Sequence, residues 1–142
     1  MSTEENKANG RRIVEEGWNQ GNTALFDELF AADFIGHDPG STFHGPEGFK
    51  QFYETYRTAF PDTHLTIEFQ IAEGDMVVAR FTGTGTHQGT LMGIPPSGKR
   101  VTTTGTTIVR YASGKAVEAW YEYDALGMLQ QIGAIPTPGQ AG

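Results

Sequence analysis

The acidic and aromatic residues of segment 117–124 are the part of this sequence best suited to proton-transfer chemistry. The segment follows a glycine turn, and its β-forming composition predicts a strand. Alternate side chains of a strand point to opposite faces, so Glu118, Trp120 and Asp124 would share one face. Burial beside an aromatic wall raises the pKa of a carboxyl group, as proton transfer requires. This face either lines a polar cavity or lies in water as a solvated strand face.

Composition limits the other kinds of chemistry. The chain has 142 residues, no cysteine and a formal net charge of −7. It therefore offers no thiol nucleophile and no disulfide, and no two histidines show the spacing of a metal site, so we expect no metal. Without a basic stripe or an apolar run of membrane length, we expect neither nucleic-acid nor membrane binding. The polar, acidic start is unlike a signal peptide and predicts a cytoplasmic protein.

The elements that position these residues are predicted as helices in the first half and strands in the second. The clearest helix is 46–60, whose aromatic residues recur at helical spacing. Apolar periodicity predicts further helices, and β-rich runs predict strands separated by glycine turns. The predicted helices are 13–18, 23–30, 46–60 and 126–132; the predicted strands are 34–37, 65–72, 76–87, 99–111 and 116–124; 38–45 and 88–98 are predicted loops.

Helices followed by an antiparallel meander predict one α+β domain. A strongly curved sheet wrapped on the long helix would form a cone, and the open end of the cone would be a ligand pocket. We expect a single domain over residues 1–142, with its core at about 11–136 and a flexible tail at 137–142.

Several short motifs also follow one another in a specific order. They are Trp18-Asn19, Ala59-Phe60-Pro61-Asp62, and the segments 73–80, 85–87, 93–99 and 114–120. In this order they resemble the SnoaL-like polyketide cyclase family, also called ester cyclases, of the nuclear transport factor 2-like superfamily of α+β cones. The resemblance covers about residues 11–136 and implies a homodimer.

The resemblance implies a lyase or isomerase that works without a cofactor and closes a polyketide ester ring by an intramolecular aldol reaction. Asp124 matches the position of the aspartate that serves these cyclases as acid and base. The histidine that they carry on the preceding strand has no counterpart, because segment 101–110 contains five threonines and no histidine. Arg80 lies among apolar residues, so we expect it to orient Asp124, to form a structural ion pair, or to lie in water at an edge.

Two other functions are kept as alternatives. The same cone builds limonene-type epoxide hydrolases, whose site is similar at Arg80 and Asp124. Thr82 stands where their epoxide-protonating acid belongs, and a threonine hydroxyl is too weak an acid for that role. The second alternative is a module that binds a small ligand without chemistry.

The expected ligand is a small, largely apolar molecule. Tyrosine hydroxyls at a pocket wall can donate hydrogen bonds to a ligand oxygen, and histidines near the rim can take part in proton transfer. Each of these side chains also has a structural interpretation, as core packing, as a turn residue or as a solvated group. The expected substrate-binding residues are Trp120, Glu118, Tyr53, Tyr56, Trp18, His37, His87 and Thr82.

Overall fold

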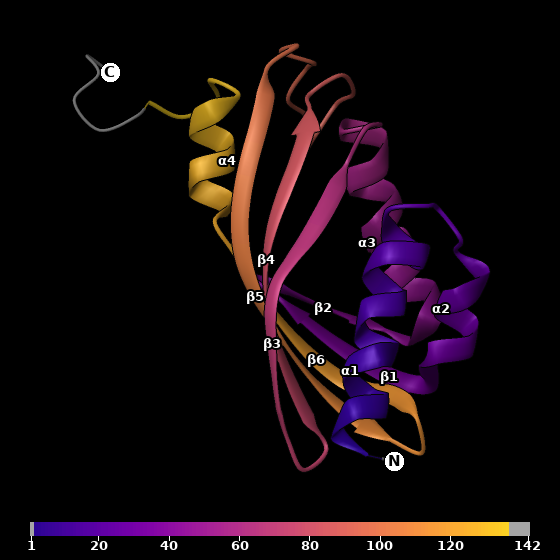
Figure 1. Cartoon of the computed structure of the whole chain (residues 1–142). Coiled ribbons are helices and arrows are strands. Elements are labelled where there is room, and N and C mark those ends of the chain that lie inside the picture. Colours follow the sequence, from indigo (N-terminus) through magenta and orange to yellow (C-terminus); the bar gives the residue numbers. More distant parts are fainter. Residues whose placement is uncertain (1, 137–142) are drawn as a thin grey trace.

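A six-stranded sheet curves around a group of helices in the computed structural model, which describes residues 2–136 (Figure 1). The spatial order of the strands is β2-β1-β6-β5-β4-β3. The elements are α1 (Thr3–Arg12), η1 (Ile13–Trp18), α2 (Ala24–Leu29), β1 (Phe30–Asp38), β2 (Ser41–His44), α3 (Gly45–Ala59), β3 (His64–Glu73), β4 (Met76–Thr86), β5 (Arg100–Ala112), β6 (Lys115–Tyr123) and α4 (Ala125–Gln131).

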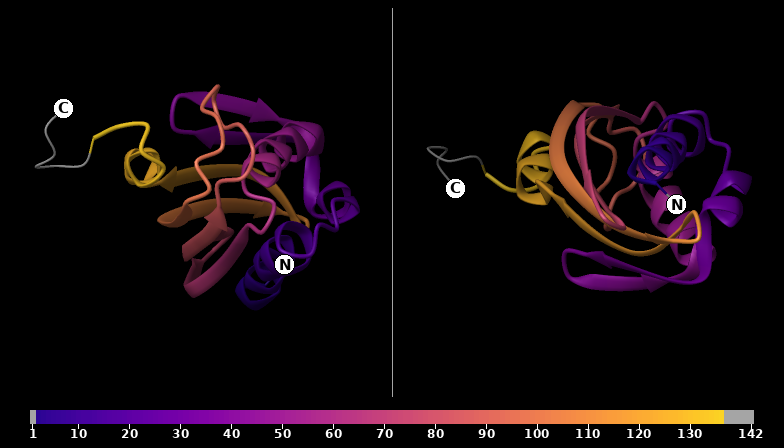
Figure 2. Two further views of the ribbon diagram at one scale, coloured as in Figure 1. Left: turned by 90° about the horizontal axis from the view of Figure 1, so that it is seen from above. Right: turned by 60° about the horizontal axis from the view of Figure 1, so that its bottom comes forward.

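The predicted α+β cone is confirmed. Strands β3 to β6 form the expected antiparallel meander, and Figure 2 shows the sheet curling around α1 and α3. Long strands twist and curl toward the face that they bury, and here the helices occupy the hollow. The concave face of the sheet is therefore the place where the fold can enclose a ligand.

The structure differs from the sequence-based expectation at three places. Residues 3–12 form α1, because Ser2 and Glu5 make a reciprocal capping box at its start. The predicted loop 38–45 contains β2, which pairs with β1. Strand β1 lies parallel to β6, so the sheet is mixed rather than wholly antiparallel. The predicted tail 137–142 lies outside the described residues.

Aromatic packing holds the helices on the concave face. Phe26 and Phe34 are fully buried, and Phe49 of α3 stacks on Phe30 with ring centroids 4.7 Å apart. The ring of Phe26 meets Phe49 edge-on at 4.8 Å. Large aromatic side chains bury much apolar surface, and edge-on or offset contacts add to that stabilisation. This cluster fixes α3 against β1 and so sets the width of the hollow.

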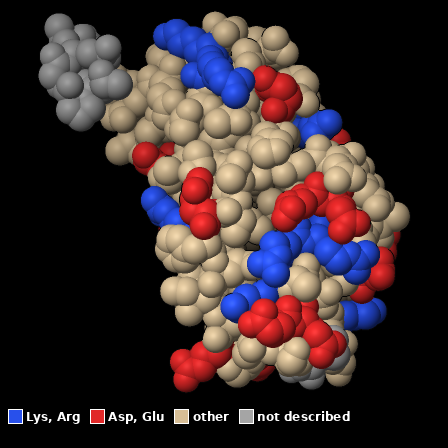
Figure 3. Space-filling view, viewed as in Figure 1, with Lys and Arg blue, Asp and Glu red and all other residues tan. Residues whose placement is uncertain are grey.

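Charged side chains of both signs are interspersed over the helical side of the molecule (Figure 3). Arg12 pairs with Glu16 and Glu28, and Lys7 pairs with Glu4. Exposed pairs of this kind contribute little to stability, but they leave no large patch of one sign on this face. None of the helices in the described part of the chain is both long and apolar enough to cross a membrane.

Candidate active site

A cavity of about 160 Å³ lies between the helices and the concave face of the sheet. Its walls are mainly apolar and aromatic, with Trp18, Phe49 and Phe52 on the helical side and Phe81 on the sheet. Within residues 2–136, no Asp, Glu, Lys or Arg is among the lining residues. A mostly apolar cavity with a few hydroxyl groups is the usual form of a small-molecule site.

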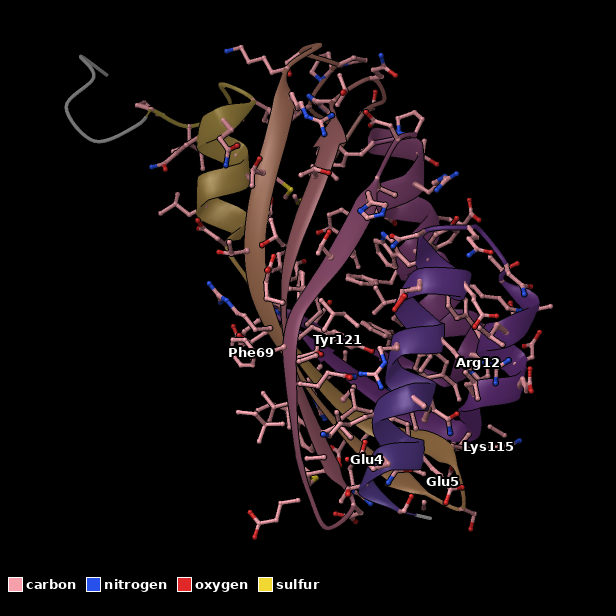
Figure 4. All side chains as sticks on the ribbon, in the orientation of Figure 1. Glu4, Glu5, Arg12, Phe69, Lys115 and Tyr121 are labelled. Carbon is pink, nitrogen blue, oxygen red and sulfur yellow. The ribbon has the colours of Figure 1, made fainter. Side chains whose placement is uncertain are left out.

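The face of β6 that lines this cavity is opposite to the one expected. Tyr121 and Tyr123 contribute to the lining, whereas Glu118, Trp120 and Asp124 do not. Figure 4 shows Tyr121 between the sheet and the helices. The face of β6 that carries the tyrosines points inward because it packs against α3. The ring centroids of Tyr121 and Phe52 are 5.8 Å apart. The solvated-face interpretation of Glu118, Trp120 and Asp124 is therefore the one that the structure supports.

Asp124 lies at the exposed start of α4 rather than in the cavity. Its Oδ1 accepts a hydrogen bond of 2.8 Å from the backbone N–H of Gly127. A carboxylate at this position satisfies a backbone donor that the helix itself cannot pair. The geometry gives Asp124 the role of a helix cap, and its role in proton transfer stays a prediction.

Removing this cap is expected to lower stability. Asp124→Ala leaves the Gly127 N–H without its acceptor and should decrease the free energy of unfolding by about 0.5–2 kcal/mol. Asp124→Asn should cost less, because asparagine caps helices about as well as aspartate. Urea denaturation followed by circular dichroism compares the two variants, and equal stability of wild type and Asp124→Ala would contradict the capping role.

Asp38, at the end of β1, is not itself a lining residue of the cavity, but its carboxylate lies beside the lining residue Tyr123. His37 faces outward, and strand alternation turns Asp38 inward, in phase with the buried Phe34. Burial raises the pKa of Asp38 above its ordinary 3.8, while the nearby hydroxyls of Tyr123 and Ser41 act in the opposite direction. Its buried Oδ1 has no hydrogen-bond partner of ordinary geometry among the described residues. An inward carboxylate with a free oxygen is a candidate general base.

Asp38 belongs to a cluster with tyrosines of the cavity wall. The hydroxyls of Tyr56 and Tyr123 are 2.8 Å apart and share a hydrogen bond. Burial is the main cause that raises the pKa of each phenol, and the negative charge of Asp38 adds to it. The same charge contributes to the raised pKa of Tyr121, for which burial is the main cause. These phenols therefore stay protonated at neutral pH and can donate hydrogen bonds.

Arg80 and Thr82 are not brought into the cavity. Val77, Ala79 and Phe81 of β4 line it, and alternation sends Arg80 and Thr82 to the other face of the sheet. The hydrogen bond that Arg80 makes is to Thr106 Oγ1 on β5, at 3.4 Å. The expected pair of Arg80 and Asp124 is therefore not assembled, and the epoxide hydrolase arrangement has no support from the geometry.

His37, Trp120 and Glu118 meet on the outer face of the sheet. His37 stacks on Trp120 with ring centroids 5.5 Å apart, and its Nε2 lies 2.7 Å from Glu118 Oε2. Arg110 donates to the other carboxylate oxygen of Glu118 at 3.0 Å. The hydrogen bond with His37, followed by that with Arg110, lowers the pKa of Glu118. The predicted binding role of these residues would have to be played outside the cavity.

His87 directly follows β4, in phase with the inward residues of that strand, but is not among the lining residues. It is fully buried against Phe60, and its Nδ1 accepts a hydrogen bond of 3.1 Å from the backbone N–H of Ser97. Its backbone also pairs with Lys99 and Gly98. These contacts close the loop 88–98 onto the sheet, so the position of His87 is that of a loop anchor.

Of the other predicted binding residues, Trp18 and Tyr56 line the cavity and Tyr53 does not. The indole N–H of Trp18 donates to Thr63 Oγ1 at 3.2 Å, which fixes the ring at the wall. Tyr53 is 3% exposed and packs edge-on against Trp18 at 5.2 Å, as a core residue.

Sequence reasoning missed Asp38, Tyr121 and Tyr123. The sequence signal for Asp38 was its position in the alternation of β1. Phe34, Gly36 and Asp38 follow one another at intervals of two residues and so share a face, which the buried Phe34 marks as the inner one. For the tyrosines, the sequence left open which of the two faces of β6 is inward, and Trp120 favoured the face that does not line the cavity.

The fold and the cavity define a cone-shaped α+β protein of the nuclear transport factor 2-like class. The model of the SnoaL-like polyketide cyclase family matches residues 8–132. The aklanonic acid methyl ester cyclase DnrD of Streptomyces peucetius is 30% identical over 135 residues, which cover 90% of this chain and 91% of that protein. The nogalonic acid methyl ester cyclase of Streptomyces nogalater is 30% identical over 130 residues, with coverage of 88% and 95%.

Among solved structures, a candidate SnoaL-like polyketide cyclase from Jannaschia sp. CCS1 superimposes with a TM-score of 0.87 at 28% identity. The match covers 94% of this chain and 95% of that chain. The chain belongs to the SnoaL-like polyketide cyclase family.

Proposed function

We propose that this protein closes a carbocyclic ring in a polyketide-derived ester by an intramolecular aldol reaction, with Asp38 as its base. The single observation that carries the assignment is the position of Asp38. Among residues 2–136, it is the one carboxylate whose charge acts on all three of the wall tyrosines Tyr56, Tyr121 and Tyr123. A base must lie beside the groups that hold the developing enolate, and these phenols are suited to that task.

The reaction needs one proton removed and one returned. Asp38 takes a proton from the carbon next to a carbonyl group and becomes neutral. The hydroxyl of Tyr123 then donates its single hydrogen bond to the enolate oxygen, while Tyr56 donates to Tyr123. The enolate carbon then attacks a second carbonyl carbon of the same molecule, forming the ring bond and an alkoxide. The alkoxide takes the proton from Asp38, so the product is an isomer of the substrate.

The uncharged wall favours an esterified substrate over a free acid. An unpaired carboxylate is strongly disfavoured in an apolar site, and no lining residue carries the positive charge that would offset its desolvation. Methyl esters are named as the substrates of the two relatives, and an ester of this kind carries no charge.

Ring closure is tested with aklanonic and nogalonic acid methyl esters. The expected product has the same mass as the substrate and a different retention time in liquid chromatography coupled to mass spectrometry. A mass increase of one water from limonene oxide, with both esters unchanged, would favour the epoxide hydrolase. Binding of the esters without any product would favour the ligand-binding module.

We also propose that a second copy of the chain covers the outer face of the sheet. Phe69, Ile71 and Ile108 are 53%, 61% and 36% exposed on this face, and Figure 4 shows Phe69 pointing away from the helices. Exposed apolar groups gathered on a sheet face are typical of an interface. The matching face of another copy would bury them, consistent with the homodimer that the family resemblance implies.

Light scattering coupled to size-exclusion chromatography tests this interface. Wild type should elute with twice the mass of the 15.5 kDa chain, and Phe69→Glu should shift the protein toward the monomer. Gln51→Glu adds the same charge on the exposed side of α3 and should stay dimeric. A monomeric wild type, or a dimeric Phe69→Glu, would contradict the proposed interface.

A further inference from the structure

Tyr111 places a further phenol hydroxyl at the cavity, outside the cluster of Asp38, Tyr56 and Tyr123. It lines the cavity near the end of β5, six residues beyond Gly105, the partner of Tyr123 in the sheet. Tyr111 therefore lies farther along β5 than the tyrosine pair of Tyr56 and Tyr123. A bulge in the pairing of β5 with β6 lies beside Tyr111, and bulges commonly re-aim side chains next to binding sites.

The hydroxyl of Tyr111 is buried without an acceptor. The residue is 3% exposed, and its Oη has no hydrogen-bond partner among the described residues. Burial raises the pKa of this phenol, so the group stays protonated and acts as a donor. A buried donor without an acceptor destabilises a protein, and native structures seldom keep one without a function.

The neighbours of the hydroxyl do not supply the missing acceptor. Gln70 meets Gly10 beside the hydroxyl, but its Oε1 accepts from Arg11 and its Nε2 donates to the carbonyl oxygen of Lys7 at 3.0 Å. Gly10 of α1 lets the hydroxyl approach the helix closely, because a Cβ atom there would lie only 3.2 Å from Tyr111 Oη. The donor is thus held against the surface of α1, at the wall of the cavity.

We propose that Tyr111 Oη anchors the far end of the ligand by donating a hydrogen bond to a neutral oxygen, either a carbonyl or a hydroxyl. This rests on the proposed function in one respect, that the cavity holds the substrate. This anchor defines the ligand more narrowly than as an apolar carbonyl compound. The ligand carries an enolisable carbonyl group that binds at the cluster of Asp38, and an uncharged oxygen group at its other end, as oxygenated aromatic polyketides do.

Two naphthalene ketones that differ by one hydroxyl test this anchor. Titrations of 2-acetonaphthone and 6-hydroxy-2-acetonaphthone into wild type, followed by fluorescence, should show tighter binding of the hydroxy compound by roughly threefold to tenfold. Tyr111→Phe should abolish this preference and leave the affinity for 2-acetonaphthone unchanged. Tyr53→Phe removes a buried tyrosine hydroxyl outside the cavity and should keep the preference.

Thermal unfolding without ligand is the control for correct folding. Because Tyr111→Phe removes an unpaired hydroxyl, it should not lower the melting temperature. Equal affinity of wild type for both ketones, no binding of either, or a preference retained in Tyr111→Phe would overturn the proposal. Asp38→Asn leaves the anchor intact and should keep the preference. Because binding requires no turnover, failure of the ring-closing function would leave this readout unaffected.

Discussion

Asp38→Asn is expected to reduce the rate of ring closure by about 10²–10⁴-fold, the usual contribution of a positioned general base. Asparagine has nearly the shape of aspartate and cannot accept the substrate proton. The Michaelis constant for a methyl ester substrate should change little, because the apolar walls supply most of the contacts. Steady-state kinetics on aklanonic acid methyl ester measures both quantities.

Asp124→Asn is the matched control. It makes the same chemical change at the residue that the sequence pattern favoured, which the structure places at the exposed cap of α4. Near-normal activity in Asp124→Asn with a large loss in Asp38→Asn would separate the two assignments. The reverse result would restore Asp124 as the acid and base.

The pH dependence of kcat/KM should report the ionisation of Asp38. Asp38 acts as a base only when deprotonated, so activity falls as the pH decreases through its pKa. Because burial raises that pKa, the acid limb should lie at higher pH than for an exposed aspartate. The effect of pH on stability has the opposite sign. Because the pKa of Asp38 is higher in the folded than in the unfolded protein, its ionisation decreases the free energy of unfolding as the pH rises from the unfolded pKa through the folded pKa.

Tyr123→Phe is expected to lower kcat by about 10²–10³-fold, as loss of a donor to a developing oxyanion does. The ring that packs in the wall is kept and one hydroxyl is lost. Tyr123 also acts on Asp38, since its hydroxyl lowers the pKa of that carboxyl group. The acid limb of kcat/KM should therefore move to still higher pH in the variant, which a purely structural tyrosine would not cause.

Tyr53→Phe is the control for this effect, because Tyr53 is a buried tyrosine outside the cavity lining. It should leave both kcat and the pH profile near wild type. A Tyr123→Phe variant with wild-type kcat, or one with a lower kcat and an unmoved acid limb, would contradict the cluster of Asp38, Tyr123 and Tyr56.

Much of the fold could be predicted because local patterns decide it. The aromatic residues of α3 recur at helical spacing, and the turn at Gly114 separates two β-rich runs. The short strand β2 could not be predicted, because its pairing with β1 is set by tertiary contact and its residues are typical of a loop. The parallel pairing of β1 with β6 joins segments far apart in sequence, which periodicity does not report.

The site was harder to predict than the fold, since alternation divides a strand into two faces without telling which one is buried. Trp120 favoured the face of β6 that does not line the cavity, and its ring is partly covered there by stacking on His37. The inward face carries tyrosines, which pattern reasoning assigns to the core. Asp38 was taken as a loop residue, although its phase with Phe34 places it on the buried side.

The most direct test of the account is deuterium exchange by an ester that can form an enolate but cannot close a ring. A methyl β-keto ester with an aryl group, incubated in D₂O and followed by proton NMR, reports proton removal alone. We expect exchange above the buffer rate with wild type and with Asp124→Asn, and exchange at the buffer rate with Asp38→Asn. Exchange that persists in Asp38→Asn and disappears in Asp124→Asn would contradict the central claim that Asp38 is the base.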